Sequence, residues 1–303
     1  MVVKRNMAMP IALIGGAVFS RWMGYLSFLS PYLIFLMLFI TYCRLSLKQL
    51  KPEKFEVKLL LIQLALSAGV YFALFAFDHV TAEGVFICVF APTATAAPVV
   101  TSMLGGRIHK VVSYSLISNL MVAAAGPPVL ALIGDGKEIS FLTSFLLILR
   151  EVVPLLLAPM LCAILLQYLA PKLHDKVANH QELSFGIWVV SLFIIVGGCV
   201  SFAINTWEPD KTLTMIYLTV GAGAVCLIQY KIGRRFGKRY GDAVSGAQSL
   251  MQKNTVLAVW LAMTYMNPLA SIGPAAYILF QNIVNSWQIA RHDSMKNFEM
   301  KAR

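Results

Sequence analysis

The chain has 303 residues, of which 58% are hydrophobic and only 13% are charged. A soluble domain carries about 25% charged residues, so this composition excludes an ordinary soluble domain and indicates a polytopic membrane protein. The formal net charge of +11 does not indicate a nucleic-acid partner, because the surplus Lys and Arg residues lie in short loops, where they orient a membrane protein.

Ten apolar segments follow one another along the chain, joined by short loops. Each is expected to be a helix, since lipid offers no partner for an unpaired backbone group. The segments cover approximately residues 7–20, 27–44, 57–77, 83–104, 108–132, 140–169, 183–205, 212–232, 242–266 and 269–289. The polar link at residues 171–182 is a candidate surface helix. Without a linker, the sequence predicts one all-α transmembrane domain over residues 1–303, in contact with the lipid bilayer.

Basic residues concentrate at every second loop and at both ends of the chain. They are Lys4, Arg5, Arg44, Lys48, Lys51, Lys54, Lys58, Arg107, Lys110, Lys231, Arg234, Arg235, Lys238, Arg239, Arg291, Lys296, Lys301 and Arg303. The opposite loops hold most of the acidic loop residues, namely Asp78, Glu83, Asp135, Glu138, Glu208 and Asp210. The positive-inside rule therefore predicts a plasma (inner) membrane protein with both termini in the cytoplasm.

Two of the ten segments contain an interruption at mid-span. In the fourth, Pro92 and Pro98 bracket Thr93 and Thr95, and each proline removes a backbone donor. In the ninth, residues 248–255 form a polar run. A kinked packing helix would account for the first alone, but two broken segments at matching places predict an inverted-repeat transporter with a midplane site. The repeats would cover about 1–135 and 136–290, followed by a cytoplasmic tail at 291–303.

Lys253 lies in the ninth segment, roughly 17 Å from one end and 20 Å from the other if the segment is helical. A lysine at this depth costs about 2.5–3.5 kcal/mol even on the mildest scale. It therefore needs a partner, a water-filled cavity or a function. One interpretation is an ionic role in transport, and the alternative is that the side chain reaches a cytoplasmic cavity and only tunes the potential there.

The segments around both interruptions carry a resemblance to a known family. Residues 92–107, PTATAAPVVTSMLGGR, resemble the fourth-helix crossover of the bile acid:sodium symporter (BASS) family, which reads about PGGTASNVVTYLAKGD. Residues 233–282 resemble that family's GRRLG…D…EVGMQNSGLAVALA…SPLA…PGALFSVWHN stretch, and residues 30–47 fit its second helix. This resemblance implies ten helices with discontinuous, crossing helices 4 and 9, a panel domain, a core domain, and transport of organic anions by alternating access.

Departures from the family concern its two sodium sites. The family's Ser-Asn pair falls on Ala97 and Pro98, its key glutamate on Ser249, and one hydroxyl position on Val111, whereas Ser115 keeps a hydroxyl. Sodium needs several hard oxygen ligands and usually a carboxylate. A shift of one residue in the ninth segment would place Gln248 in the glutamate position, which still removes the negative charge.

Lys253 falls where the family has the glutamine of its second sodium site. An ammonium there can satisfy the carbonyls and negative dipole end of a helix C-terminus, as a bound cation would. Burial also disfavours the charged form of an amine, so the same lysine could instead carry a proton. We expect either a fixed surrogate cation or a proton carrier.

The sequence thus predicts a secondary carrier of small organic anions, sodium-independent, with proton coupling through Lys253 as an open alternative. Two other candidates are a sodium-coupled bile-acid-like symporter and a non-transporting receptor or scaffold with the same fold. We expect neither an enzyme nor a cofactor, metal or nucleic-acid partner. The candidate substrate-binding residues are Thr93, Thr95, Ser115, Asn119, Gln252, Lys253, Asn254 and Thr255. The candidate ion-coupling residues are Gln248, Ser249 and Lys253.

Overall fold

A computed structural model describes residues 5–45, 53–134, 141–207 and 209–302, and within these residues every regular element is a helix. The helices are α1 (Arg5–Val18), α2 (Ser20–Leu26), η1 (Ser27–Leu29), α3 (Ser30–Tyr42), α4 (Lys54–Phe75), α5 (His79–Phe90), α6 (Ala97–Met103), α7 (Ile108–Ile133), α8 (Phe141–Leu169), α9 (Pro171–Asn179), α10 (Gln181–Asn205), η3 (Pro209–Lys211), α11 (Thr212–Arg239), α12 (Ala243–Met251), α13 (Thr255–Tyr265), η4 (Pro268–Ser271) and α14 (Ile272–Ala302). The all-α prediction is confirmed.

Four stretches of helix are long and apolar enough to cross a membrane: Lys54–Phe75, Ile108–Ile133, Leu183–Asn205 and Pro209–Arg239. Large apolar side chains also cover the outside of the molecule; Leu132, for example, is 86% exposed and Phe72 is 74% exposed. Water would disfavour a surface of this kind, whereas lipid tails would not. The helix lengths and the surface together are those of a membrane protein.

Each predicted apolar segment lies on a helix or on consecutive helices, but several boundaries differ. The segment at 27–44 is divided between η1 and α3. The candidate surface helix is present as α9, and no residue of it is buried. The predicted tail at 291–303 is helical as far as Ala302, because α14 continues through it. Its polar residues still suit a helix, since none of them is a proline or glycine.

The two interrupted segments are each broken into two helices. In the first, the helix ends at Phe90 and restarts at Ala97, with Pro92 in the gap and Pro98 in the first turn of α6. A proline in the first turn is favourable because the amide it lacks would have no helical partner there. In the second, α12 ends at Met251 and α13 begins at Thr255. The connection between the half-helices covers residues 91–96 in the first segment and residues 252–254 in the second.

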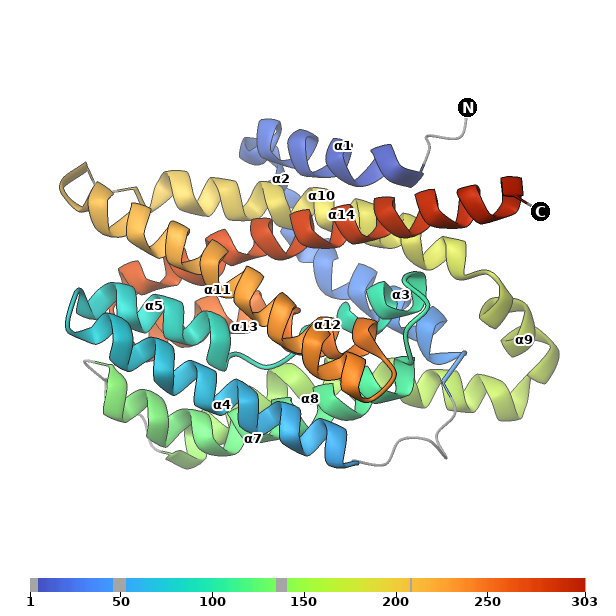
Figure 1. Ribbon diagram of the computed structural model, residues 1–303, viewed down its shortest axis with the longest axis horizontal. Helices are drawn as coiled ribbons and strands as arrows, with labels where there is room; N and C mark the ends of the chain where they lie inside the picture. The colour runs from blue at the N-terminus through green and yellow to red at the C-terminus, as the bar shows by residue number, and fades with distance from the viewer. Residues whose placement is uncertain (1–4, 46–52, 135–140, 208, 303) are drawn as a thin grey trace.

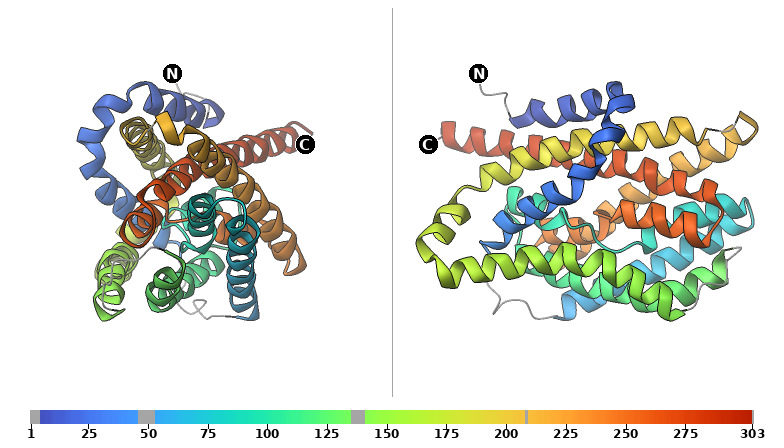
Figure 2. Two further views of the ribbon diagram at one scale, coloured as in Figure 1. Left: turned by 90° about the vertical axis from the view of Figure 1, so that its left-hand side faces the viewer. Right: turned by 180° about the vertical axis from the view of Figure 1, so that it is seen from behind.

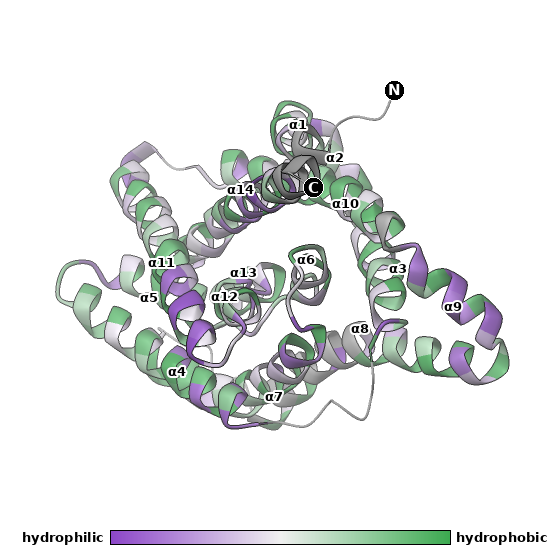
Figure 3. Ribbon diagram, turned by 45° about the vertical axis from the view of Figure 1, so that its right-hand side comes forward, coloured by the Kyte–Doolittle hydropathy of each residue, from purple (hydrophilic) through white to green (hydrophobic). Residues whose placement is uncertain are grey.

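The half-helices occupy the middle of the molecule. Figure 3 looks nearly along the helices and shows α6, α12 and α13 inside a ring formed by the longer ones. On one side of this centre, α10 packs against α1, α2 and α3; on the other, α5 packs against α4 and α11. Figures 1 and 2 show both chain termini at the same end of the molecule. The broken helices are therefore shielded from the surroundings, as non-helical backbone at membrane depth must be.

Candidate functional site

The two breaks in the helices meet in a short antiparallel pairing between Thr93 and Lys253. The amide of Ala94 donates to the carbonyl of Gln252 at 2.9 Å, and the amide of Asn254 donates to the carbonyl of Pro92 at 2.8 Å. We call residues 91–96 the first crossing loop and residues 252–254 the second. Each loop thus satisfies part of the other's backbone at a depth where water would otherwise be needed.

The C-terminus of α5 is capped by Lys253. Its Nζ donates to the carbonyl oxygen of Ala91 at 3.0 Å, and the residue is only 1% exposed. Gln63 of α4 donates to the carbonyls of Phe90 and Ala91 at 2.9 and 3.1 Å. Within the described residues, no carboxylate lies within ion-pair distance of this ammonium. A protonated Lys253 amine would be balanced here by carbonyl oxygens and the negative end of the α5 dipole.

The C-terminus of α12 is capped in the same manner but without a charge. The Thr93 hydroxyl donates to the carbonyl of Ser249 at 2.8 Å, and the Tyr277 hydroxyl donates to the carbonyl of Met251 at 2.7 Å. Thr93 is fully buried. The central residue of each crossing loop thus reaches a carbonyl near the end of the opposite half-helix.

The backbone of each central residue is also held by a neighbouring helix. On α7, Ser118 accepts from the amide of Thr93 at 3.2 Å, and Asn119 donates to its carbonyl at 3.4 Å. On α14, Gln281 alone makes both contacts with Lys253, accepting from its amide at 2.9 Å and donating to its carbonyl at 3.4 Å. Polar side chains of α7 and α14 therefore replace the helical hydrogen bonds lost at the breaks.

A further pair of matching contacts lies behind the loops. Tyr114 of α7 donates to Gln63 of α4 at 2.5 Å. Gln229 of α11 donates to Tyr277 of α14 at 2.8 Å and to the carbonyl of Cys88 at 3.4 Å. A glutamine and a tyrosine from two flanking helices thus support each side of the crossing.

Two carboxylates accept hydrogen bonds from backbone amides at the ends of the half-helices that lie away from the crossing. Asp242 caps α12 by accepting from the Ser245 amide, and its other oxygen accepts from the amide of Arg107, in the loop that follows α6. Glu83 of α5 accepts from the amide of Asn267, which follows α13. Glu83 was predicted to be a loop residue, and this prediction is wrong: Glu83 lies in α5 and is fully buried, and its carboxylate binds the α13–η4 turn.

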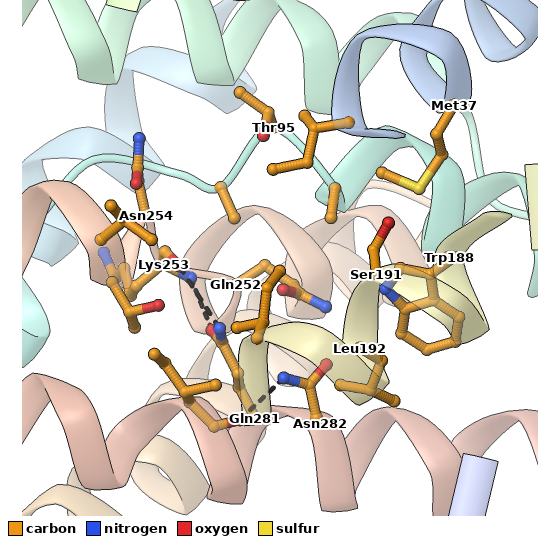
Figure 4. A pocket seen from close by; sticks show the side chains of 17 residues that line it. Met37, Thr95, Trp188, Ser191, Leu192, Gln252, Lys253, Asn254, Gln281 and Asn282 are labelled. Atoms are coloured by element: carbon orange, nitrogen blue, oxygen red, sulfur yellow. Dashed lines mark hydrogen bonds between the residues drawn. The ribbon is translucent and has the colours of Figure 1, made fainter. Parts of the chain in front are cut away.

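A cavity of about 80 Å³ lies beside the crossing loops. One wall is formed by residues of both loops and α14, and the other by Ile34 and Met37 of α3 with Trp188, Ser191, Leu192 and Ile195 of α10. Figure 4 shows Lys253 and Asn254 on one side, Trp188 and Ser191 on the other, and Gln281 and Asn282 between them. This volume has room for a few water molecules. It is smaller than the ~300 Å³ at which small-molecule pockets typically begin.

Five of the eight candidate substrate-binding residues line this cavity: Thr95, Gln252, Lys253, Asn254 and Thr255. The other three, Thr93, Ser115 and Asn119, do not. Thr93 is occupied by its contact with Ser249, while Asn119 donates to the carbonyl of Ser115 at 2.8 Å.

The remaining candidates for ion coupling also lie off the cavity. Gln248 faces α14, where its amide donates to Asn285 at 3.4 Å. Ser249 is fully buried, and it is its backbone carbonyl that takes part in the crossing. Lys253 is thus the one ion-coupling candidate that lies both at the crossing and at the cavity wall.

The backbone N–H groups at the N-termini of α6 and α13 have partners within the chain. The amide of Ala97 donates to Ala94, and Pro98 has no amide hydrogen. At α13, the amides of Thr255 and Leu257 donate to Lys253 and to the Asn254 side chain. These N–H groups are therefore satisfied within the chain. Side chains and helix dipoles remain as the polar features of the wall.

Sequence reasoning missed several cavity residues. Gln281 and Asn282 lie in the middle of the tenth apolar segment, where an adjacent Gln-Asn pair was a signal that could have been used. Trp188 and Ser191 carried no such signal, since a tryptophan and a serine are unremarkable in an apolar helix. Only the packing of α10 against the crossing loops brings them to the site.

No family model matches the chain, and no curated protein is significantly similar to it.

Proposed function

We propose that this protein is a sodium-independent secondary carrier of small organic anions, with the ten-helix architecture of the BASS family. Lys253 takes the place of a coupling cation in this mechanism. The observation that carries the proposal is the buried Lys253 side chain, which has no carboxylate partner among the described residues and binds the end of one broken helix at its crossing with another. A structural protein would have no use for this expensive arrangement.

Two inverted five-helix repeats account for the matching contacts around the crossing. Helices α4, α5–α6 and α7 in one half correspond to α11, α12–α13 and α14 in the other. Under this correspondence Gln63 and Tyr114 match Gln229 and Tyr277, and Thr93 matches Lys253. Ten spans follow when α2, η1 and α3 are counted as one span and each broken pair as one.

The chain carries a short sequence repeat that agrees with this correspondence. Residues 114–119 of α7 read YSLISN, and residues 277–282 of α14 read YILFQN. The tyrosines support the crossing in both halves, and each asparagine, Asn119 and Asn282, donates to the carbonyl four residues earlier at 2.8 Å. Equivalent residues in equivalent roles support a duplicated unit.

Lys253 acts as a fixed cation in this proposal. Its Nζ is directed at Ala91 rather than being free in the cavity, so the positive charge draws an anion into the site while the helix end stays satisfied. Sodium is not needed, because the ammonium already supplies the charge. The positions that hold sodium in the BASS family are Ala97, Pro98 and Ser249 here, and they offer no carboxylate.

The substrate occupies the cavity between the crossing loops and α10. Its carboxylate or sulfonate faces the polar wall formed by Thr95, Gln252 and Asn254, while Trp188 and Leu192 contact its apolar part. The present volume of about 80 Å³ is a closed state. Entry therefore requires α3 and α10, the panel of this carrier, to move relative to the core that holds the crossing.

Uptake by proteoliposomes tests this function. Purified protein is reconstituted with a panel of radiolabelled small carboxylates and sulfonates, with and without sodium and pH gradients. Saturable uptake of an anion, unchanged when choline replaces sodium, is expected. Sodium-stimulated uptake would support the symporter alternative. Specific binding of an anion without uptake would support a receptor.

The proposed topology has its own test. Reporter fusions after Arg303 and within residues 135–138 should report opposite sides of the membrane, with the C-terminus in the cytoplasm. A result that places both fusions on the same side would contradict the ten-span arrangement.

A further inference from the structure

The last two turns of α11 carry five basic residues in nine positions: Lys231, Arg234, Arg235, Lys238 and Arg239. Their spacing of i, i+3, i+4, i+7 and i+8 places them on one face of the helix, and all five are exposed. Among the described residues, no carboxylate lies within ion-pair distance of any of them. We call these five residues the cation stripe.

Aromatic residues mark the depth at which the stripe begins. Tyr230 of α11 and Trp287 of α14 are in edge-to-face contact, with ring centroids 6.1 Å apart, and Trp287 is 49% exposed. Arg291 lies over the Trp287 ring at 5.7 Å. Trp and Tyr collect at the headgroup level of membranes. The stripe therefore starts at the headgroup level and continues outward from it.

The face of α11 opposite the stripe packs very closely against α12. A Cβ atom added to Gly233 would lie 2.3 Å from the carbonyl oxygen of Gly246, and one added to Gly237 would lie 2.9 Å from the Gly246 Cα atom. Glycine is required here because the two backbones touch. The stripe is thus mounted on a rigid pair of helices, one of which leads directly into the second crossing loop.

A second helix widens the basic surface. Phe55, in the first turn of α4, stacks on Phe236 with centroids 5.6 Å apart and contacts Tyr240 at 5.5 Å. This contact brings Lys54 and Lys58, both exposed, to the end of α11. In Figure 3 the ribbon is hydrophilic in colour at the end of α11, beside α12 and α4.

We propose that the cation stripe binds the headgroups of anionic phospholipids in the adjacent leaflet. Membrane orientation alone requires basic residues at one end of a helix, on any face. A single exposed face of five cations that begins at headgroup depth offers Arg and Lys donors to the phosphates of lipid headgroups. The proposal requires that the protein sits in a bilayer, but not that it transports.

The test compares lipids on the purified full-length protein in a neutral detergent. The thermal unfolding midpoint is followed while phosphatidylglycerol, phosphatidylcholine of the same chain length or inorganic phosphate is added. We expect phosphatidylglycerol alone to raise the midpoint saturably, with affinity that falls as salt is added. In the double variant Arg234→Gln with Lys238→Gln, the affinity should fall roughly 25-fold, about fivefold for each lost cation.

A matched control removes another exposed pair at the same spacing, Lys172→Gln with Lys176→Gln on α9, and should bind like the wild type. A charge-preserving variant, Arg234→Lys, should also bind and shows that a loss is not due to misfolding. Equal stabilisation by phosphatidylcholine, equal loss in the α9 control, or full competition by inorganic phosphate at matched concentration would each overturn the proposal.

Discussion

The two crossing loops have almost the same surroundings but different central residues. Thr93 and Lys253 pair with each other, and each caps a carbonyl at the end of the opposite half-helix. Each is held by polar side chains of the adjacent long helix, α7 or α14. One cap is a neutral hydroxyl and the other is an ammonium.

This difference shows which part of the lysine's role at the crossing a neutral side chain can also fill. A hydroxyl is sufficient to satisfy a buried carbonyl, as Thr93 shows at Ser249. The fold therefore does not need a lysine at the matching position. Under the proposed function, the charge of Lys253 serves the substrate rather than the fold.

Among the changes at the two crossing loops, removal of the Lys253 charge should have the largest effect, and this effect is on uptake. In Lys253→Met the carbonyl of Ala91 keeps its bond from Gln63, so folding should be retained. We expect uptake of an organic anion to fall roughly 100-fold, because hydrogen bonds that involve a charged group contribute about 1.5–3 kcal/mol. Initial uptake rates in proteoliposomes, normalised to folded protein, measure this.

A second variant, which keeps the positive charge at residue 253, serves as a control for that experiment. Lys253→Arg keeps the charge but needs more room at a fully packed position and presents a planar group, so it should also transport poorly. Normal uptake by the methionine variant, with an unchanged pH profile, would show that Lys253 is only tolerated.

The next largest effect is expected when Gln281 is replaced, and it is a loss in the free energy of unfolding. Gln281 alone holds both backbone groups of Lys253, whereas Ser118 and Asn119 share that role at Thr93. Gln281→Leu leaves a buried amide without this partner and should lower the free energy of unfolding by ~2 kcal/mol.

The matched change on the other side is Ser118→Ala. It should cost about 1 kcal/mol, since it removes the hydroxyl that accepts from the Thr93 amide and donates to the Ser115 carbonyl, while the Asn119 contact with the Thr93 carbonyl remains. Denaturant or thermal unfolding in detergent gives both values. A larger loss for Ser118→Ala than for Gln281→Leu would mean that the first loop, not the second, depends more on its helix.

Thr93→Val tests the neutral cap itself. The change keeps the shape of the side chain and leaves the carbonyl of Ser249 without the hydroxyl, so we expect a loss of ~1 kcal/mol in stability. Thr93→Ser restores the donor and should recover most of this loss. If uptake falls as strongly in Thr93→Val as in Lys253→Met, the two loops are functionally equivalent and the charge has no special role.

Replacement of sodium by choline at constant pH should have the smallest effect, namely none on initial uptake. The positions resembling sodium ligands are Ala97, Pro98 and Ser249, and a fixed ammonium lies at the crossing. A saturable increase of uptake with sodium would show that a cation still binds elsewhere in the site.

Single residues in the sequence predicted much of the arrangement at the crossing. Pro92 and the polar run at 248–255 predicted the two breaks, and the structure has them at residues 91–96 and 252–254. The depth of Lys253 marked it as exceptional, and it is buried at the crossing. The matching hexapeptides at 114–119 and 277–282 were present but not used, because their equivalence becomes clear only from their contacts.

By itself, the sequence determined the helical class, the positions of the apolar segments and the location of the breaks. These follow from local chemistry: apolar runs need lipid or a core, and proline removes backbone donors. The tertiary structure decided which of the polar residues meet. The cavity lining does not include Thr93, Ser115 or Asn119, but it includes Trp188 and Ser191. The physical reason is that hydrogen-bond partners of a buried group are chosen by packing between distant helices, which spacing along one chain segment does not encode.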